Sequence, residues 1–271
     1  MQNVNQETIL QDMFLKALNE PGKLADYYGY FKNYSYMNML LLWFQGANSP
    51  VATYKRWLEL GRQVKKGAKA KGIWIPSSRK AKREIDGVEE EYSYLTFRFV
   101  NCIFELNDTD GVNIYSPEIM IPQFDKASLL QNLGITETPF KGLKGNVQGY
   151  AMPNSKNLSI NPLAKYPHKT MLHEIAHCLL HERDHEGLVT HDGVSIPRDI
   201  REVEAEGTAL LAGSFLGIFT EEEKSFSRGY IQGWLKNNEL PEKTCKRVFK
   251  AVNLILEALG HGKDEENEKA A

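Results

Sequence analysis

Apolar residues near the start of the chain recur every three or four positions, from Ile9 to Leu18. The repeat stops at a proline-glycine pair, so the spacing predicts one amphipathic helix that ends before the proline. Two further helices are predicted over 36–44 and 53–60, and a glycine follows the second one.

The pattern then changes to a period of two. Leu95, Phe97 and Phe99 alternate with polar residues, which predicts a half-buried strand over 92–104. Another strand is predicted to begin at Gly72, after a loop rich in lysine and glycine.

Helical periodicity dominates the second half of the chain, after a predicted hairpin with strands over 147–152 and 157–160. Helices are predicted over 126–133, 169–182, 198–216, 221–236 and 242–259.

Prolines and glycines punctuate the stretch 107–123, which is typical of a linker. We therefore expect an α+β protein of two domains. A mixed α+β domain is predicted over 1–115, and a mostly helical domain with a small sheet over 124–271.

The composition fits a soluble globular protein. The chain has 271 residues, of which 42% are hydrophobic and 25% are charged. No apolar run approaches the ~18 residues of a membrane span, and the N-terminus lacks the basic start and apolar centre of a signal peptide. The three cysteines are far apart, which argues against a disulfide framework. We expect a cytoplasmic protein without a membrane partner.

Charge is distributed unevenly along the chain, although the net charge is only −2. Between Val51 and Arg83 the sequence contains eleven basic residues and one acid. A stretch with this excess of positive charge can bind a polyanion such as a nucleic acid.

His173, Glu174 and His177 form a His-Glu-x-x-His motif inside the helix predicted over 169–182. At about 100° per residue the two histidines lie about 40° apart around the helix, so both imidazoles can bind one cation. The glutamate next to them can polarise a bound water. The motif predicts a zinc site, one ion per chain, with Glu174 as the catalytic base; another divalent metal is an alternative.

A third ligand is expected from an acid on the following helix. Glu202 and Glu206 share one face of that helix, about 40° apart, whereas Glu204 points about 200° away from Glu202. We assign Glu202 as the ligand and Glu206 as the carboxylate that orients a ligating imidazole. Glu204 is the substitute ligand, and an exposed acidic helix face is the alternative reading.

Other polar residues near the motif carry weaker signals. His181 is turned about 80° from His173, so we expect it to pack or to support a ligand rather than to bind the metal. Hydrogen-bond donors to an oxyanion could come from four residues. These are Tyr150, Tyr166, His185 and His191.

Two parts of the sequence resemble ArdC-type antirestriction proteins. The first includes a helix with Ser35, Asn38, Leu41 and Leu42, the segment WLELGRQVKKG that begins at Trp57, and the strand from Ile73 to Pro76. The second is HEIAHCLLH followed by REVEAEGTALLAGSFL, which is similar to the zincin-like domain of the same proteins and of ImmA/IrrE-type metallopeptidases.

The resemblance covers most of 34–216 and implies an N-terminal domain that binds single-stranded DNA and a C-terminal domain related to zinc metallopeptidases. It also implies antirestriction work on a mobile element. The helices from Glu221 onward match no part of the family pattern, and the turn at 110–112 is a weak counterpart of it.

The basic segment supports the DNA interpretation, because lysine and arginine neutralise phosphates while aromatic rings stack on unpaired bases. Trp57 fits a core position equally well, and a solvated basic loop is the alternative for the whole segment. The residues expected to bind DNA are Tyr54, Lys55, Arg56, Arg62, Lys65, Lys66, Lys69, Lys71 and Trp74.

The expected function is therefore that of an antirestriction protein with a zinc metallopeptidase centre and a protein or peptide substrate. The strand predicted over 157–160 could hold an extended peptide by edge pairing. Two alternatives remain open at this point. One is a protein that shields single-stranded DNA and uses its metal for structure; the other is a regulatory peptidase that cleaves a repressor.

Overall fold

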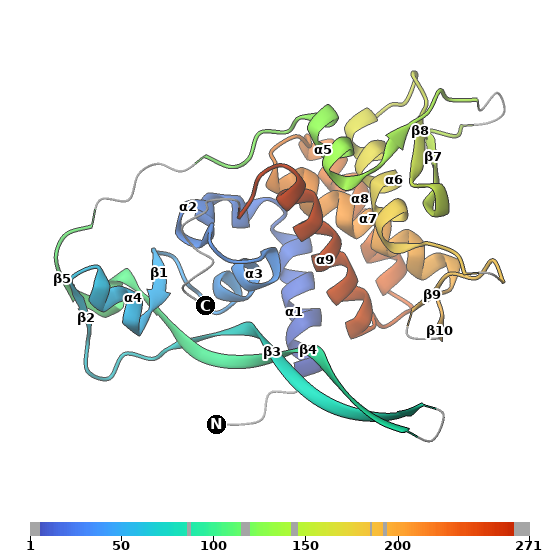
Figure 1. The fold of residues 1–271 in the computed structure, drawn as a ribbon. Coiled ribbons are helices and arrows are strands. Elements are labelled where there is room, and N and C mark those ends of the chain that lie inside the picture. Colours follow the sequence, from blue (N-terminus) through green and yellow to red (C-terminus); the bar gives the residue numbers. More distant parts are fainter. Residues whose placement is uncertain are drawn as a thin grey trace. The chain divides into compact units, whose positions relative to one another are not determined.

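The computed structural model describes residues 6–85, 88–114, 120–141, 146–184, 186–191 and 194–262. Within these residues the chain forms two compact units. We call the first, made of residues up to 40 and from 120 onward, the helical unit. We call the second, which begins at residue 41 and ends at 114, the ribbon unit. The mixture of helices with small sheets confirms the expected α+β class (Figure 1).

The helical unit is built around one buried helix, α7 (Arg198–Phe215). It packs against α6, α8, α9 and α1, and its residues from Val203 to Phe215 are all buried, as expected for a helix surrounded by others. The helices of this unit are α1 (Gln6–Asn19), η1 (Lys23–Tyr27), α2 (Tyr28–Phe31), α5 (Lys126–Leu133), α6 (Pro167–Leu180), α7, α8 (Glu221–Leu235) and α9 (Glu242–Ala258).

Residues 6–40 belong to the helical unit, although the sequence placed them in a domain over 1–115. Phe14 of α1 packs on Phe249 of α9, with ring centroids 6.2 Å apart. Tyr28 and Tyr36 direct their rings edge-on against Phe215 of α7, at 5.8 and 5.9 Å. Helical periodicity identifies the apolar face of a helix but not the element that covers it. The boundary between the two units therefore differs from the domain boundary expected from the sequence.

A small sheet lies beside α6 and contains the predicted hairpin. Its order is β6 (Thr136–Glu137), β8 (Asn157–Ile160) and β7 (Gly149–Met152). β8 is the central strand, parallel to β6 and antiparallel to β7. The expectation that 157–160 offers a free edge is therefore wrong, because both of its edges are paired. η3 (Pro153–Ser155) joins β7 to β8, and β9 (Thr190–His191) pairs with β10 (Val194–Ser195).

Gly149 allows β7 to lie directly against α6. A Cβ atom at this position would lie 2.8 Å from Cγ2 of Thr170 and 3.3 Å from Cγ of Glu174. Both distances are tighter than ordinary packing, so a larger residue would push the strand away from the helix.

The ribbon unit is dominated by a long antiparallel pair, β3 (Lys71–Ile85) and β4 (Val88–Glu105). β1 (Val51–Thr53) pairs with β4, and β2 (Arg62–Val64) pairs with β5 (Thr109–Gly111), which lies within the expected linker. α4 (Tyr54–Glu59) begins after Thr53, whose hydroxyl accepts the N–H of Arg56. η2 (Leu106–Asp108) follows β4, and α3 (Tyr36–Phe44) contains the boundary between the two units.

The strand predicted over 92–104 exists, but its apolar face is not covered as expected. Leu95 is 67% exposed and Phe97 is 54% exposed. They share one face of the ribbon with Phe99, Pro76 and Trp74, because these residues lie opposite one another or two apart in the register. The alternation of apolar and polar residues correctly predicted that this strand has two different faces. It does not reveal whether another layer of the protein covers either face.

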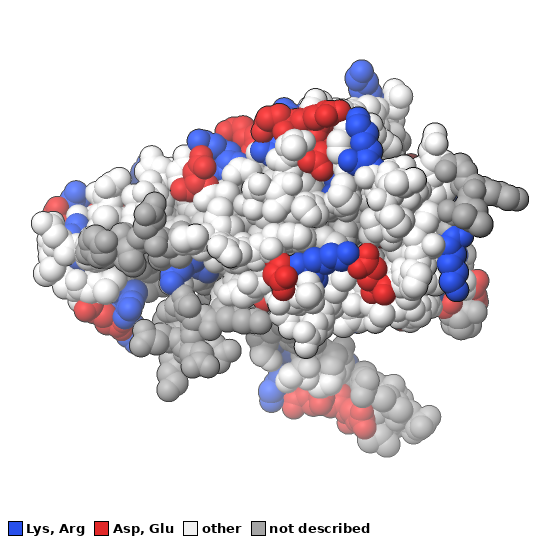
Figure 2. All heavy atoms as spheres, turned by 90° about the horizontal axis from the view of Figure 1, so that it is seen from above, with Lys and Arg blue, Asp and Glu red and all other residues white. Residues whose placement is uncertain are grey.

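Charged side chains of both signs lie side by side on the face shown in Figure 2, in keeping with the small net charge. None of the described helices is long and apolar enough to cross a membrane.

Glu105, at the end of β4, is the buried carboxylate that ties together the loop before β1 and the start of β3. It accepts the backbone N–H groups of Asn48 and Ser49 at 2.9 and 3.2 Å and pairs with Lys71 at 2.8 Å. Burial favours the neutral carboxyl, but the hydrogen bonds from Lys71, Asn48 and Ser49 outweigh it and lower the pKa of Glu105 below its ordinary value.

We expect Glu105→Gln to lower the free energy of unfolding of the ribbon unit by about 2–3 kcal/mol, because charge-assisted hydrogen bonds are lost and Lys71 stays enclosed. Urea denaturation followed by tryptophan fluorescence measures this, since Trp43, Trp57 and Trp74 of the four tryptophans lie in that unit.

The pH dependence of the free energy of unfolding provides a second test with the same variant. Because the folded pKa of Glu105 is lowered, its contribution is complete above the unfolded value of 4.5 and is lost as the pH falls through the folded value. The difference between Glu105→Gln and the wild type should therefore shrink below pH 4.5. Glu89→Gln is the control, because Glu89 forms an exposed pair with Lys82 and should matter by less than about 0.5 kcal/mol. Equal losses in both variants would contradict the assignment.

Candidate metal centre

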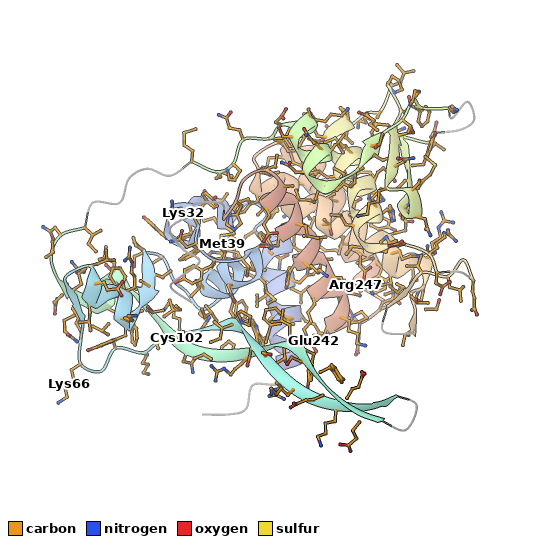
Figure 3. The ribbon with its side chains drawn as sticks, in the orientation of Figure 1. Lys32, Met39, Lys66, Cys102, Glu242 and Arg247 are labelled. Carbon is orange, nitrogen blue, oxygen red and sulfur yellow. The ribbon has the colours of Figure 1, made fainter. Side chains whose placement is uncertain are left out.

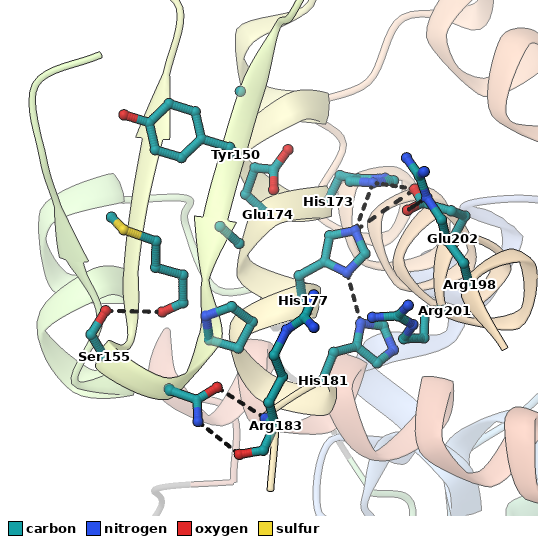
Figure 4. A pocket seen from close by; sticks show the side chains of 15 residues that line it. Tyr150, Ser155, His173, Glu174, His177, His181, Arg183, Arg198, Arg201 and Glu202 are labelled. Carbon is teal, nitrogen blue, oxygen red and sulfur yellow. Dashed lines mark hydrogen bonds and ion pairs between the residues drawn. The ribbon is translucent and has the colours of Figure 1, made fainter. Parts of the chain in front are cut away.

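Three side chains from two packed helices converge at one point in the helical unit (Figure 4). α6 contributes His173 and His177, one turn apart, and α7 contributes Glu202. One donor atom of each lies within 4.8 Å of the others. The structure thus brings together the three residues that the sequence singled out as ligands.

The donor atoms are spaced as ligands of one ion would be. The Nε2 atoms of His173 and His177 are 3.1 Å apart, and Oε2 of Glu202 lies 3.4 and 3.8 Å from them. Bonds of about 2.05 Å at tetrahedral angles would place neighbouring donors about 3.3 Å apart. Two imidazole nitrogens and a carboxylate oxygen are also a donor set suited to a divalent ion such as Zn²⁺.

His173 is held in place by the carboxylate expected for this task. Its Nδ1 lies 3.1 Å from Oε2 of Glu206, and Oε1 of Glu206 pairs with Lys169 at 2.7 Å. Burial lowers the basicity of His173, yet the carboxylates of Glu202 and Glu206 outweigh it and raise its pKa to about 9. Because Nδ1–H donates to Glu206, Nε2 is left to face Glu202.

His177 is held by a longer chain of buried groups. Its Nδ1 lies 2.7 Å from Nδ1 of His181, whose Nε2 lies 2.9 Å from Oε2 of Glu204. Glu204 pairs in turn with Arg247 of α9, a residue labelled in Figure 3. The ionised carboxylate can only accept, so His181 carries its proton on Nε2 and accepts at Nδ1. His177 must then donate from Nδ1, which leaves the lone pair of its Nε2 directed at the cluster.

This arrangement corrects the role considered for Glu204. Its side chain is fully buried and its carboxylate binds His181 and Arg247, so it does not reach the cluster as a substitute ligand. His181 supports a ligand, which is one of the two roles expected for it. Burial lowers the pKa of His181 and so favours the neutral ring that this chain of hydrogen bonds requires.

Glu174 lies beside the three donors and lines the same cavity. It is 8% exposed, and burial raises its pKa above the ordinary value of a glutamate. The cavity encloses about 770 Å³. One wall is formed by β7 and η3, and the other by α6 and the start of α7 (Figure 4).

Of the expected oxyanion donors, only Tyr150 lines the cavity, and its ring packs against Phe140. The Tyr166 hydroxyl donates to Glu222 at 2.5 Å instead. His185 and the side chain of His191 lie outside the described residues.

The residues expected to bind DNA fall into two groups. Tyr54, Lys55, Arg56, Lys65, Lys66 and Lys69 are exposed, and Lys66 projects from the loop between β2 and β3 (Figure 3). Trp74 is half-buried and contacts Phe99. Trp57 is a core residue, 2% exposed, as its spacing allowed.

Arg62 and Lys71 do not fit the expected DNA-binding role. The guanidinium of Arg62 donates to the hydroxyl and carbonyl of Thr109 at 2.7 and 2.9 Å and so holds β5 to β2. Lys71 is the partner of buried Glu105. Charge along the sequence does not distinguish a lysine or arginine that binds its own chain from one that is free to bind phosphate.

Comparisons with known proteins agree with the resemblance read from the sequence. Residues 16–103 match the family described as the N-terminal domain of anti-restriction factor ArdC. The metal-free crystal structure of the antirestriction ArdC protein from plasmid R388 is 19% identical, with a TM-score of 0.51, over 94% of this chain and 98% of that chain. Its Mn(II)-bound structure is 17% identical, with the same TM-score and coverage. No curated protein sequence matches the chain. Residues 16–103 thus match the ArdC N-terminal family, and the fold is similar to that of the ArdC protein from plasmid R388.

We expect the purified protein to bind about one divalent metal ion, such as zinc, per chain, measured by elemental analysis after dialysis. His177→Ala and Glu202→Ala should lose most of the metal, because each removes a direct bond. Glu182→Ala, which removes an exposed acid just after α6, should keep full occupancy. Full occupancy in the Glu202 variant would remove that residue from the ligand set.

The hydrogen-bond chain behind His177 gives a separate expectation. His181→Phe keeps a ring but removes both nitrogens, and it should weaken metal binding about 10- to 100-fold in chelator competition. His181→Asn should recover part of this loss, since its amide oxygen can accept the proton on Nδ1 of His177. Wild-type affinity in a folded Phe variant would show that His181 does not position His177.

Proposed function

We propose that the chain is an ArdC-type antirestriction protein whose helical unit hydrolyses a peptide bond with a divalent metal and whose ribbon unit binds single-stranded DNA. The observation that carries the peptidase part is the convergence of His173, His177 and Glu202 beside Glu174 in one cavity. The match of residues 16–103 to the ArdC N-terminal family supports the DNA-binding part.

The metal is proposed from the donor set and from the related protein. The ArdC structure that shares this fold has been determined with Mn(II), and two imidazoles with one carboxylate also suit Zn²⁺. Such an ion, when bound, would lower the pKa of a water and polarise a substrate carbonyl. His173, His177 and Glu202 would hold it, oriented by Glu206 and His181.

Glu174 is the proposed general base and acid. Glu174 follows His173 directly in the helix, and its side chain lines the cavity together with the three candidate ligands. There it would take the proton from the attacking water and then pass it to the amine of the leaving peptide. Gly149 keeps β7 close to this carboxylate, which narrows the cleft around the scissile bond.

The substrate is proposed to lie along β7. β7 is an edge strand of its sheet and lines the cavity, and no other described strand pairs with its second edge. An extended peptide can therefore add to it through backbone hydrogen bonds. This role replaces the one expected for 157–160, which is the central strand.

Single-stranded DNA is proposed to bind the ribbon unit through exposed cations and rings. Lys65, Lys66 and Lys69 are exposed in the loop after β2. Lys65 also contacts the carbonyl of Asn107 and the carboxylate of Asp110 at the surface. Phe97 adds an exposed ring that the sequence interpretation placed on a half-buried strand. Cations neutralise phosphates and rings stack on unpaired bases, so the two surfaces together suit a single strand better than a duplex.

A second candidate function is shielding of single-stranded DNA without proteolysis, in which the metal has a structural role. The exposed aromatic face of the ribbon favours it, because that surface does not depend on the metal cluster. A peptidase that cleaves a repressor would use the same cleft as the main proposal.

Glu174→Gln separates these functions. It should keep the metal and the fold but lower cleavage of a randomised peptide pool by at least about 10²-fold, because proton transfer is lost. Glu182→Gln is the matched control. In cells, loss of antirestriction activity in Glu174→Gln supports cleavage, whereas full activity would favour shielding.

DNA binding is best tested in the full chain, because residues 6–40 belong to the helical unit. We expect substitution of Lys65, Lys66 and Lys69 by alanine to weaken binding to oligothymidylate and to reduce its salt dependence. Replacing three exposed lysines of the helical unit should have little effect and controls for net charge. These are Lys23, Lys126 and Lys246.

The role of the ribbon face is tested by Phe97→Ala, which should cost about 1–3 kcal/mol of binding through lost stacking. Leu95→Ala removes an apolar side chain from the same face without removing a ring and should have a smaller effect. Equal effects, or a preference for duplex, would reject the ribbon as a stacking surface.

A further inference from the structure

Three arginines line the metal cavity. Arg198 and Arg201 lie in the first turn of α7, and Arg183 follows α6 (Figure 4). Positions three apart share a helix face, so the two arginines of α7 border the cavity together. They stand on the wall opposite β7 and beside Glu202.

The positive charges of these guanidinium groups are only weakly neutralised by carboxylates of the described chain. Arg198 reaches Glu202 only at 3.9 Å, and its side chain is 85% exposed. The Nε atom of Arg201 is buried without a hydrogen-bond partner, and Arg183 donates to the carbonyl of Gly187. Among the described residues, neither Arg183 nor Arg201 has a carboxylate within ion-pair distance.

The net charge of the residues that line the cavity is positive when a divalent metal ion is bound. The acids that line it are Glu174 and Glu202, and both have tasks at the centre. Three guanidinium groups and a divalent ion exceed these two carboxylates. A partly enclosed cleft screens such an excess less than open water does, so it favours an anionic ligand.

We propose that the cleft selects peptides with an acidic side chain, which Arg198 and Arg201 bind next to the cleavage site. The planar guanidinium matches a carboxylate in a two-bond geometry, and both arginines line the cavity next to Glu202. A phosphodiester could also bind arginine. The edge strand β7 on the facing wall, however, offers backbone donors and acceptors that match an extended peptide and not a nucleic acid.

This inference specifies the substrate of the proposed peptidase and rests on that function. Binding is therefore measured separately from cleavage, in zinc-loaded Glu174→Gln. The probes are three pools of end-blocked octapeptides that differ only at two fixed positions, which hold Glu, Gln or Lys. The Glu pool should bind at least about tenfold more tightly than the Gln pool, and the Lys pool should bind most weakly.

Arg198→Gln with Arg201→Gln, added to Glu174→Gln, should bring the ratio of Glu-pool to Gln-pool affinity close to one. Arg79→Gln removes an exposed arginine of β3 and should leave the ratio intact. Zinc content verifies that each variant keeps its fold, and the single Arg198→Gln serves if the double variant does not. For that exposed residue a partial fall in the ratio is expected.

Two results would overturn the proposal. One is equal binding of the Glu and Gln pools to zinc-loaded Glu174→Gln, even if the wild type cleaves peptides. The other is a loss of oligothymidylate binding in the arginine variants while the Glu-pool preference persists, which would make the arginines a phosphate site. Failure of the peptidase proposal looks different, because the wild type would then cleave none of the three pools.

Discussion

The candidate metal centre depends on two buried carboxylates of α7, Glu204 and Glu206, that stand behind the histidines of α6. An isolated charge in such a place would cost several kcal/mol, and each carboxylate is accordingly paired, Glu206 with Lys169 and Glu204 with Arg247. Glu206 accepts directly from one histidine, and Glu204 acts on the other through an intervening ring. Both imidazoles thereby direct Nδ1 away from the cluster and Nε2 toward the same point. The two Nε2 atoms are 3.1 Å apart, a distance that requires a cation or a proton between them, because two lone pairs would repel each other.

The rest of the helical unit serves to keep α7 in place. This helix is buried from Val203 to Phe215, with α6 and α8 packed on it and with α1 and α9 completing the cover. The beginning and the end of the described chain therefore support the same helix. Arg247 of α9 makes the support electrostatic as well as apolar. A substitution that loosens α9 should thus affect the orientation of His177, although it lies far from the cluster in sequence.

Local spacing was enough to locate the centre in the sequence. His173, His177, Glu202 and Glu206 lie on two helices at one-turn intervals, and a helical period places such residues on one face without knowledge of the tertiary fold. Glu204 was misjudged as a substitute ligand, because its use depends on Arg247, which is 43 positions away.

The ribbon unit shows more clearly what the pattern of apolar and charged residues in a sequence cannot predict. Alternation predicted the two faces of β4, but it could not indicate that Leu95 and Phe97 lack a covering layer. The count of basic residues likewise included Arg62 and Lys71, whose partners Thr109 and Glu105 come from other strands. β7 is an edge strand because of the order of strands in its sheet. The periodicity of a sequence does not reveal that order.

Anomalous diffraction at the zinc absorption edge, from crystals of the zinc-loaded protein, tests the candidate metal centre directly. We expect one strong peak per chain, bonded at about 2.0–2.2 Å to Nε2 of His173, Nε2 of His177 and a carboxylate oxygen of Glu202. His181 should lie behind His177 without touching the ion. A peak bonded through Nδ1 of either histidine, through Glu204, or located away from α6 and α7 would contradict this expectation.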